Sequence, residues 1–461
     1  MKKFFLAVVA LMIAVSTTQV MAQKVDQESF NKKFKSSDAD IANAKKNIKA
    51  ATWLNRAKLH LDAASAPSGN IFSGMDVATM KLTMGNPKKT TWPTINGQKY
   101  QVLEYDYIMI YTVNNKIVSW KITRQVKPNA LFESIKCYNK AAEIDATQAG
   151  KAREGLDLIV NLCNERGRIA PLIHNFKEGA DSYMIAYNAQ NSKAYGDKVD
   201  PSLLYAAGNL YTLDGLKNKA SFATGEKALR KAIELGYIDI EAKSTLIADK
   251  DKGTTYYYLY HCMIGQEDKL TQERLDELKK LMIEGVTKFP KNVKMLDALL
   301  SFCTSSKYNV GSPAEIIPLI DKAIENEPNN ADLWFGRGRV YYALKNTDEC
   351  IKSFSKVTLY NPKNFDAQFY LGHFYAVKGD EYGKTIAAKS YTDQNEYNAD
   401  IAKLNAMYAL AIEPLEKAHA LDTKDFPTIE YLKTICFRLR DDEGVMEKYN
   451  KYNELFKNAN K

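Results

Sequence analysis

Leu333 to Asn346 belongs to a pattern that recurs 34 residues further along the chain. A recurrence of this length is typical of paired antiparallel helices joined by a short turn. One such pair cannot bury its apolar faces alone, so each pair must pack on the next. The pattern therefore predicts a mostly α-helical solenoid. Its recurring positions are Trp334, Gly338, Tyr341, Cys350, Phe354, Val357 and Pro362, followed by Gln368, Leu371, Gly372 and Tyr375.

This spacing resembles the tetratricopeptide repeat, whose consensus is W-x2-L-G-x2-Y, then A-x3-F, then a small residue and Pro. Arg337 departs most from it, because the consensus places Leu there. Gly338 is expected where the two helices of a pair approach most closely. This close approach explains why a glycine, which lowers helix stability, occurs inside a helix. The best repeats are predicted at 331–364 and, with an insertion near 380–400, at 365–424.

Similar marks elsewhere predict about seven or eight helix pairs in total. Residues 127–461 are assigned to the solenoid, and its final pair, within 427–457, is expected to act as a solubilising cap. Pro414 removes one helical hydrogen bond and is expected to begin or kink a helix. The predicted pairs are 148–190, 204–211 with 225–236, 255–265 with 275–290, 295–302 with 314–328, 367–375 with 411–422, and 427–439 with 443–457.

A segment of different character interrupts the first predicted pair. Residues 51–65, within the range 23–69, and residues 130–145 have helical patterns, whereas 70–126 is predicted to be an α+β insertion. Asn114-Asn115 is a hairpin turn signal between two apolar runs. The run before it is expected to form one alternating strand, with Leu103, Tyr105, Tyr107, Met109 and Tyr111 on one side.

The insertion also resembles a known kind of small domain. Gly74-Met75, Val77 and Gly85-x-Pro87 precede the Tyr-rich strand and the strand that begins with Asn114. This combination is similar to the SmpA/OmlA domain of outer-membrane assembly and to β-lactamase-inhibitor-protein-like modules. Long insertions in compact domains are usually functional. The segment is therefore interpreted either as a second binding surface or as a purely structural insertion.

The Gly-Arg-Gly-Arg sequence at 336–339 invites a competing interpretation as a phosphate-binding loop. Such a loop needs a preceding strand and free backbone amides at a helix start. Here Asn329, Asn330 and Asp332 supply the helix start, so Gly336 and Gly338 fall inside the helix. A nucleotide site is therefore not expected.

The tetratricopeptide resemblance implies a concave groove lined by the first helix of each pair. Aromatic and charged side chains suit a peptide groove because they combine rigid contact area with oriented hydrogen bonds. Packing between repeats is the alternative role, above all for Phe335 and Phe369. The positions that the resemblance nominates are Asp332, Phe335, Arg339, Tyr342, Asp366, Phe369, His373, Ser202, Tyr205, Asn209, Tyr257, His261, Leu296 and Leu300.

Residues 1–22 have the pattern of a secretory signal peptide. Lys2 and Lys3 precede an apolar run that is too short to span a membrane, and Val20-Met21-Ala22 suits cleavage after Ala22. The first cysteine is Cys137, so a lipid-attachment cysteine near the cleavage site is missing. We expect a soluble exported protein, which would be periplasmic in a Gram-negative bacterium.

Charge and cysteine usage narrow the possible partners and chemistry. Cleavage of the signal peptide removes Lys2 and Lys3 and lowers the formal charge from +9 to +7. The remaining Lys and Glu alternate along helices and form no basic stripe. A nucleic-acid partner is therefore not expected. The cysteines are widely spaced in apolar helical contexts, so we expect buried free thiols. A Cys262–Cys303 bridge between neighbouring helices is the main alternative. The six are Cys137, Cys163, Cys262, Cys303, Cys350 and Cys436.

The sequence offers little sign of catalysis. It lacks H-E-x-x-H, G-x-S-x-G and C-x-x-C, and no histidine has a second histidine or a cysteine three or four residues away. We therefore predict no metal, no cofactor and no enzymatic activity. The histidines, expected to be packed or surface residues, are His60, His174, His261, His373 and His419.

The pattern as a whole favours a non-catalytic exported scaffold that binds protein or peptide partners in the cell envelope. The main alternative is a factor for outer-membrane or secretion-complex assembly that acts through the insertion. A third possibility, an enzyme or carbohydrate-binding protein, would need a polar pocket between the insertion and the solenoid.

Overall fold

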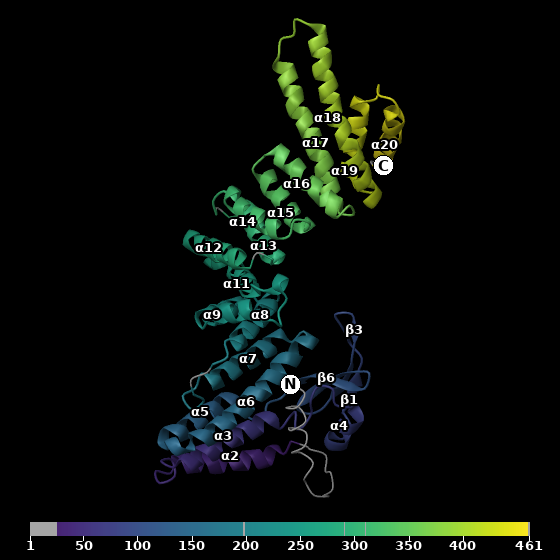
Figure 1. Ribbon diagram of the computed structural model, residues 1–461. Helices are drawn as coiled ribbons and strands as arrows, with labels where there is room; N and C mark the ends of the chain where they lie inside the picture. Colours follow the sequence, from purple (N-terminus) through teal and green to yellow (C-terminus); the bar gives the residue numbers. More distant parts are fainter. Residues whose placement is uncertain (1–24, 197–198, 290, 309, 460–461) are drawn as a thin grey trace. The chain divides into compact units, whose positions relative to one another are not determined.

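The computed structural model describes residues 25–196, 199–289, 291–308 and 310–459 (Figure 1). The chain forms two compact units, with unit 1 ending at Tyr237 and unit 2 beginning at Ile238. Each unit is described by itself. The predicted export signal at 1–22 lies outside the described residues.

Unit 1 is built from helices that pack in sequence order. α3 packs on α5, α6 on α7, and α8 on α9, so the predicted pairs in this part of the chain are confirmed. An additional helix, α2, packs on α3 and was not predicted. The helices are α2 (Gln27–Ala42), α3 (Ala50–Ser65), α5 (Ala130–Ile144), α6 (Ala149–Ile169), α7 (Phe176–Gln190), α8 (Ser202–Gly215) and α9 (Ala220–Glu234), with short η1 (Ala146–Gln148) and η2 (Ala170–Ile173).

Between α3 and α5 lie a short helix and a small antiparallel sheet. The hairpin predicted at Asn114-Asn115 is confirmed, since Val113 pairs with Lys116 and both asparagines have positive φ. The four-stranded sheet has the order β1-β4-β5-β6, and β2 pairs with β3 separately. The elements are α4 (Val77–Met84), β1 (Lys89–Thr91), β2 (Thr94–Ile95), β3 (Gln98–Lys99), β4 (Gln101–Glu104), β5 (Ile108–Val113) and β6 (Lys116–Ile122).

The expected single strand through Tyr105 and Tyr107 is wrong. The chain turns there, and β4 and β5 pair antiparallel with Leu103 opposite Ile110. The turn changes which side chains share a face, because alternation is continuous only within one strand. Leu103 consequently packs with Ile108 and Ile110, whereas Met109 and Tyr111 lie in a separate cluster.

The sheet is docked on the end of α6. Ser119 donates a hydrogen bond to the carbonyl oxygen of Ile169 at 2.8 Å, and the Tyr100 hydroxyl donates to that of Leu172 at 2.9 Å. Ile169 and Ile173 belong to the apolar clusters on the two faces of the sheet. The insertion is therefore packed into unit 1 through a shared apolar core.

Unit 2 continues with helix pairs, and four of them match predicted ones; the predicted pairing of 295–302 with 314–328 is seen only in part, because α13 and α14 each pack on α15. α11 packs on α12, α15 on α16, α17 on α18, and α19 on α20. The helices that follow α10 (Tyr237–Lys243) are α11 (Thr254–Ile264), α12 (Gln272–Lys288), α13 (Val293–Thr304), α14 (Ile317–Asn326), α15 (Ala331–Ala343), α16 (Thr347–Tyr360), α17 (Phe365–Ala388), α18 (Gln394–Leu421), α19 (Phe426–Arg438) and α20 (Val445–Ala459), with short η3 (Asp249–Asp251), η4 (Glu267–Lys269) and η5 (Pro313–Ile316).

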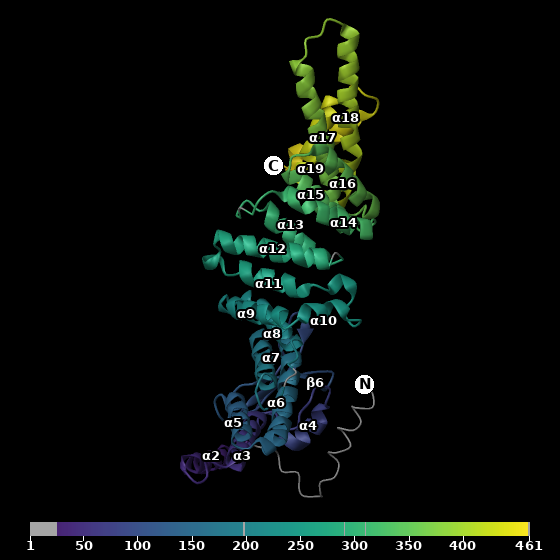
Figure 2. The same ribbon diagram turned by 60° about the vertical axis from the view of Figure 1, so that its left-hand side comes forward.

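The predicted insertion near 380–400 lengthens α17 and α18 rather than forming a separate loop domain. Figures 1 and 2 show the far ends of these two helices side by side, beyond the other helices of unit 2. The buried Asp400 carboxylate holds these ends together, because it accepts hydrogen bonds from Tyr382 at 2.8 Å, Tyr391 at 2.9 Å and Lys389 at 3.1 Å. These donors also hold the pKa of Asp400 well below its usual range.

Pro414 was predicted to begin or kink a helix, and the first of these two alternatives is wrong. α18 begins at Gln394 and continues through Pro414 to Leu421. Proline cannot donate to the carbonyl four residues earlier, which belongs to Leu410. Leu410 is exposed, so water can satisfy that carbonyl, while buried Pro414 lies among residues that pack on neighbouring helices.

The paired helices approach most closely where a glycine faces a large residue. A Cβ atom on Gly338 would lie 2.7 Å from the Phe354 ring, one on Gly372 2.5 Å from Leu415, and one on Gly208 2.4 Å from Leu229. The predicted contact role of Gly338 is therefore confirmed. The same geometry recurs in both units.

The cysteines fill the interior, as predicted. All six are buried thiols, so the alternative of a Cys262–Cys303 bridge is not realised. Burial raises the pKa of the Cys303 thiol to about 11 and that of Cys163 to about 12. These thiols act as small apolar side chains within the helix pairs.

Gly338→Ala should destabilise unit 2, because its methyl group must displace the fully buried Phe354 ring. We expect a loss of about 1–2 kcal/mol, as overpacking outweighs the better helix propensity of alanine. Gly383→Ala is the matched control, since its Cβ would meet Leu404 only at 3.8 Å. The control should gain about 0.5–1 kcal/mol. Urea unfolding followed by circular dichroism measures both, and equal effects would contradict the packing role.

His60 makes the stability of unit 1 depend on pH. It is 2% exposed, its two ring nitrogens have no hydrogen-bond partner among the described residues, and burial followed by Arg56 lowers its pKa to about 4. Below pH 6.5 the unfolded chain takes up a proton that the folded chain resists, so stability falls between about pH 6.5 and pH 4.

Between pH 7 and pH 5, the wild type should lose up to about 2 kcal/mol more unfolding free energy than His60→Leu. Urea unfolding at the two pH values tests this difference. A loss that is the same in both proteins would show that His60 does not titrate in this way.

Candidate binding groove

The first helices of three successive pairs, α13, α15 and α17, line a surface groove in unit 2. It consists of two depressions of about 300 and 490 Å³, and Phe335 lines both. We use "the groove" for these two depressions together. The lining residues are Lys294, Leu296, Asp297, Leu300, Thr304, Asp332, Phe335, Arg339, Tyr342, Ala343, Asp366 and Tyr370.

Seven of the nominated residues meet in this groove. Asp332, Phe335, Arg339 and Tyr342 come from α15, and Asp366 comes from the equivalent position of α17, 34 residues after Asp332. Leu296 and Leu300 contribute an apolar wall from α13. The repeat spacing correctly predicted that these residues share one surface. Their role in binding a partner stays a prediction.

The aromatic residues of the groove differ in how freely they face solvent. Phe335 is half-buried and lies edge-on to Phe354, with ring centroids 5.6 Å apart. Tyr342 is 50% exposed and lies beside the rings of Tyr370 and Phe374, at 6.0 and 5.5 Å. Phe335 therefore both packs and lines the groove, whereas Tyr342 keeps half of its surface open to solvent.

Two further nominated residues of α17 lie outside the depressions and contact α19. Phe369 lies edge-on to Tyr431 at 5.8 Å, and the Nδ1 atom of His373 is 2.7 Å from the Tyr431 hydroxyl oxygen. Burial lowers the pKa of His373. These two residues pack between successive helix pairs, which was the alternative role considered for Phe369.

Arg339 joins α15 to the preceding first helix. Its guanidinium contacts the Asp297 carboxylate at 2.7 Å and donates to the Ser301 hydroxyl at 3.2 Å. Its side chain remains 32% exposed. Arg339 therefore links two walls of the groove while keeping part of its surface open.

Arg337, the least typical residue of the repeat, has a structural role. Its guanidinium is nearly buried and forms ion pairs with Asp321 of α14 at 2.8 Å and Glu349 of α16 at 2.6 Å. It also donates to the Ser353 hydroxyl at 3.0 Å and lies 4.6 Å from the Tyr341 ring centroid. Three helices are tied together where the consensus places an apolar leucine.

The groove carries carboxylates that are open to a partner. Asp332 and Asp366 are exposed, and neither forms an ion pair within the described part of the chain. Lys294 is the one lysine among the lining residues, and the charge of Arg339 is offset by Asp297. The groove therefore offers apolar and aromatic walls with two available negative charges.

The remaining nominated residues are not part of the groove. Tyr205 and Asn209 belong to unit 1, where Tyr205 stacks on Tyr237 at 4.7 Å. Tyr257 and His261 lie on α11 of unit 2, and their ring centroids are 4.4 Å apart. Burial lowers the pKa of His261. Ser202 lies at the start of α8 in unit 1.

Sequence reasoning missed several lining residues: Lys294, Asp297, Thr304, Ala343 and Tyr370. Tyr370 follows the nominated position 369 by one residue, so its aromatic character was the available signal. Asp297 could have been found only as the partner of Arg339, which requires the crossing of α13 and α15.

A separate cavity of about 570 Å³ lies in unit 1, where the end of the insertion meets the helices. A polar pocket near the insertion is what the third possibility considered from the sequence, an enzyme or carbohydrate-binding protein, would need. Its polar lining includes Lys127, Arg166, Glu178, Asp181 and Tyr211, none of which was nominated from the sequence. Its other residues are Ala63, Ala64, Pro67, Ile122, Gln125, Val126, Asn129, Ala130, Leu131, Phe132, Ser182, Met184 and Ile185.

The described ranges contain neither a cluster of metal ligands nor a helix suited to span a membrane. No group of three or more His, Cys, Asp or Glu side chains there is arranged to hold a metal ion. Across the same residues, no helix combines the length and apolar character needed to cross a membrane.

Residues 319–352 match the family model of the tetratricopeptide repeat. The match covers most of α14, all of α15 and the start of α16, which are the helices tied together by Arg337. The chain thus contains a tetratricopeptide repeat, and the predicted fold class, a helical solenoid with a small sheet near the N-terminus, is confirmed. No curated protein matches the chain.

Several solved structures resemble the chain at low identity. YrrB, described as a tetratricopeptide protein with an unusual peptide-binding site, is 18% identical over 50% of this chain and 91% of its own, with a TM-score of 0.31. The TPR2AB domain of yeast Sti1, in complex with pHSP90, is 13% identical over 66% and 99%, with a TM-score of 0.23. An IFIT1 monomeric mutant with Gppp-AAAA is 12% identical over 70% and 68%, with a TM-score of 0.32.

A double-mutant cycle on Asp297→Asn and Arg339→Gln tests whether their contact supports the groove. Because the Asp297 side chain is 62% exposed, we expect a coupling energy of about 0.2–1 kcal/mol in urea unfolding. The coupling should shrink in high salt, which screens exposed charges. A coupling of zero at low salt would show that Arg339 does not hold the two helices together.

Proposed function

We propose that this chain is a non-catalytic scaffold that holds a partner protein by binding an extended peptide segment in the groove of unit 2. One observation carries the proposal. Successive first helices bring exposed Tyr342 and half-buried Phe335 onto one hollowed surface, together with Asp332 and Asp366, which lie 34 residues apart and form no ion pair with any described residue.

The chemistry of the groove specifies the kind of segment it would hold. Leu296, Leu300 and Phe335 form an apolar floor for a hydrophobic side chain, and Tyr342 adds rigid aromatic area. Asp332 and Asp366 favour a lysine or arginine, because opposite charges give specificity and faster association. The preferred segment therefore combines an apolar residue with a basic one.

The proposal places this binding role in the cell envelope without catalysis. The N-terminal pattern of two lysines, an apolar run and a small-residue cleavage motif supports export. The tetratricopeptide repeat at 319–352 supports a scaffold role, since solenoids of this type present extended binding surfaces.

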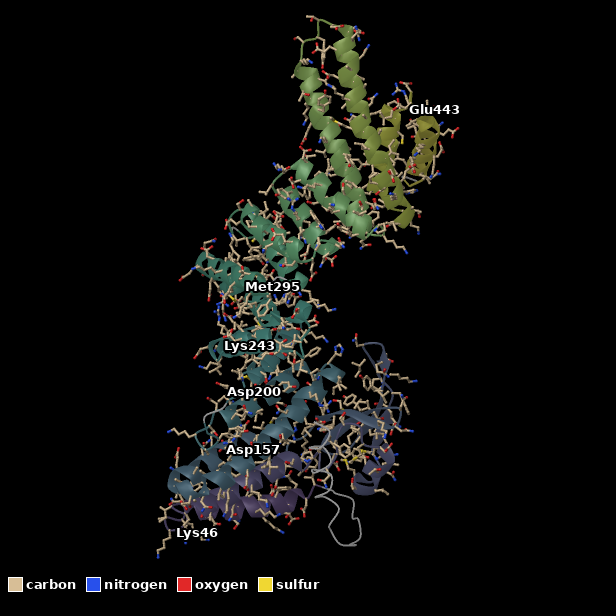
Figure 3. All side chains as sticks on the ribbon, viewed as in Figure 1. Lys46, Asp157, Asp200, Lys243, Met295 and Glu443 are labelled. Atoms are coloured by element: carbon tan, nitrogen blue, oxygen red, sulfur yellow. The ribbon has the colours of Figure 1, made fainter. Side chains whose placement is uncertain are left out.

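The test is affinity capture from envelope extract with the full mature chain. Tyr342→Ala and Asp366→Lys should each reduce the partner recovered by about tenfold, because each removes a groove contact of at least about 1.4 kcal/mol. Leu359→Ala is the control for the tyrosine, since Leu359 is 65% exposed on α16. Glu443→Lys, in the loop before α20, makes the same charge change as Asp366→Lys outside the groove (Figure 3).

The two controls should recover the partner as the wild type does. If wild type and all four variants capture the same proteins in the same amounts, the groove is not the binding surface. Circular dichroism melts of the variants separate loss of binding from loss of folding.

A second candidate function uses the insertion as a surface for membrane-complex assembly. The insertion exposes three large apolar side chains, Phe72, Leu82 and Trp92, at 56%, 70% and 58%. Because its sheet shares a core with α6, deleting 70–126 would uncover Ile169 and Ile173 and disturb unit 1. Surface substitutions are the cleaner probe.

Under that candidate, Leu82→Ser with Trp92→Ser should abolish co-sedimentation with outer-membrane complexes while leaving peptide capture by the groove intact. The control is Leu246→Ser, a 90% exposed leucine of unit 2. Unchanged co-sedimentation of the double variant would eliminate the insertion as an assembly surface.

A further inference from the structure

The cavity of unit 1 has one charged wall and one apolar wall. Arg166 of α6 and Glu178 of α7 supply the two charges that matter most, and the apolar wall comes chiefly from Leu131, Phe132 and Met184. Its volume of about 570 Å³ falls within the range of cavities that enclose small organic molecules. Every lining residue belongs to unit 1.

Within the described residues, not every hydrogen-bond donor of the Arg166 guanidinium has an acceptor. One terminal nitrogen donates to the carbonyl oxygen of Ala64, in the last turn of α3, at 2.8 Å. The Nε atom is shielded from solvent and has no hydrogen-bond partner among the described residues. No carboxylate in those residues forms an ion pair with this guanidinium. The shielded Nε donor is therefore out of reach of a ligand, and a carboxylate would meet the part of this planar cation that lines the cavity.

Glu178 is the complementary acceptor. Burial raises the pKa of its carboxyl, while the positive charge of Arg166 and the hydrogen bond from Asn175 oppose that rise. Asp181, one turn further along α7, is already occupied, because it accepts hydrogen bonds from the Tyr211 hydroxyl and Lys177 at 2.6 Å each. Glu178 is therefore the carboxyl group that remains for a ligand.

We propose that this cavity binds a small organic zwitterion of amino-acid to dipeptide size. Its carboxylate pairs with Arg166, its ammonium group pairs with Glu178, and its apolar side chain lies against Leu131, Phe132 and Met184. The site is distinct from the groove of unit 2 and does not rest on the function proposed for it.

The charge arrangement selects this class over other small molecules. A phosphate-rich ligand would meet the negative charges of Glu178 and Asp181. A purely apolar ligand would desolvate the charges of Arg166 and Glu178 and leave them only the Ala64 carbonyl and the Asn175 amide as hydrogen-bond partners. A zwitterion satisfies both charged groups at once, so its transfer into the cavity exchanges hydration for paired hydrogen bonds.

Isothermal titration calorimetry with the full mature chain tests the proposal, with the dipeptide leucyl-leucine as probe. Leucyl-leucinamide and N-acetyl-leucyl-leucine each lack one of the two charges, so both should bind at least about tenfold more weakly. Arg166→Gln should weaken leucyl-leucine binding by a similar factor, and Arg166→Lys should lose less, since it keeps the charge and a donor. Glu178→Gln should weaken leucyl-leucine but leave N-acetyl-leucyl-leucine unaffected.

Arg168→Gln is the matched control, because Arg168 lies on the same helix, is exposed and pairs with Glu165. It should bind leucyl-leucine as the wild type does. Melting curves of each variant confirm that unit 1 is folded, and Arg166→Lys keeps a donor for the Ala64 carbonyl should Arg166→Gln unfold.

Three results would overturn the proposal. The first is that the wild type shows no saturable binding of leucyl-leucine up to about 10 mM, a concentration at which a specific site should already be occupied. The second is that the dipeptide and its two blocked forms bind equally well. The third is that folded Arg166→Gln binds leucyl-leucine as strongly as the wild type. Each result is independent of whether the groove of unit 2 captures a protein.

Discussion

The rest of the structure depends on the close approach of two helices at a glycine. In three pairs, the missing side chain of Gly208, Gly338 or Gly372 leaves room for one large residue of the partner helix. Because the pair is held so tightly, its first helix presents a fixed set of residues on the opposite face. That set recurs with the repeat, which is why Asp332 and Asp366 occupy equivalent positions along the groove.

Two neighbouring arginines show how one helix serves both packing and recognition. Arg337 points into the layer between α14 and α16, where Asp321, Glu349 and Ser353 satisfy its guanidinium. Arg339, two residues later, points toward α13 and stays partly exposed. A buried ion pair offers little net stability compared with an apolar residue, but it penalises any arrangement that leaves a charge unpaired. Arg337 thus favours one register of the three helices.

Much of this organisation was predictable, because it follows from local spacing. Most of the helix pairs, the role of Gly338, the hairpin at Asn114-Asn115 and seven groove residues follow from periodicity and turn chemistry. The turn at Tyr105–Tyr107 was missed because its residues continue the alternating pattern of a strand. Pro414 does not begin a helix, because α18 continues through it and the residue whose carbonyl loses its donor, Leu410, is exposed.

Contacts between helices distant in sequence could not be predicted from one chain. The partners of Phe369 and His373 lie on α19, and Asp297 meets Arg339 only because α13 and α15 are neighbours. The cavity of unit 1 joins residues from five helices and the end of the insertion, with no shared spacing. Such sites depend on three-dimensional packing, so sequence periodicity gives no signal for them.

The central claim is that the groove formed by the first helices of unit 2 holds the partner. Site-specific incorporation of a photo-crosslinking amino acid in cells tests it most directly, at Tyr342 in the groove and at Leu359 on α16. Leu359 is the more exposed of the two, at 65% against 50%, so accessibility alone favours the control position. The account predicts a discrete protein adduct from position 342 and none from position 359. Adducts from position 359 alone, or equal adducts from both, would contradict it.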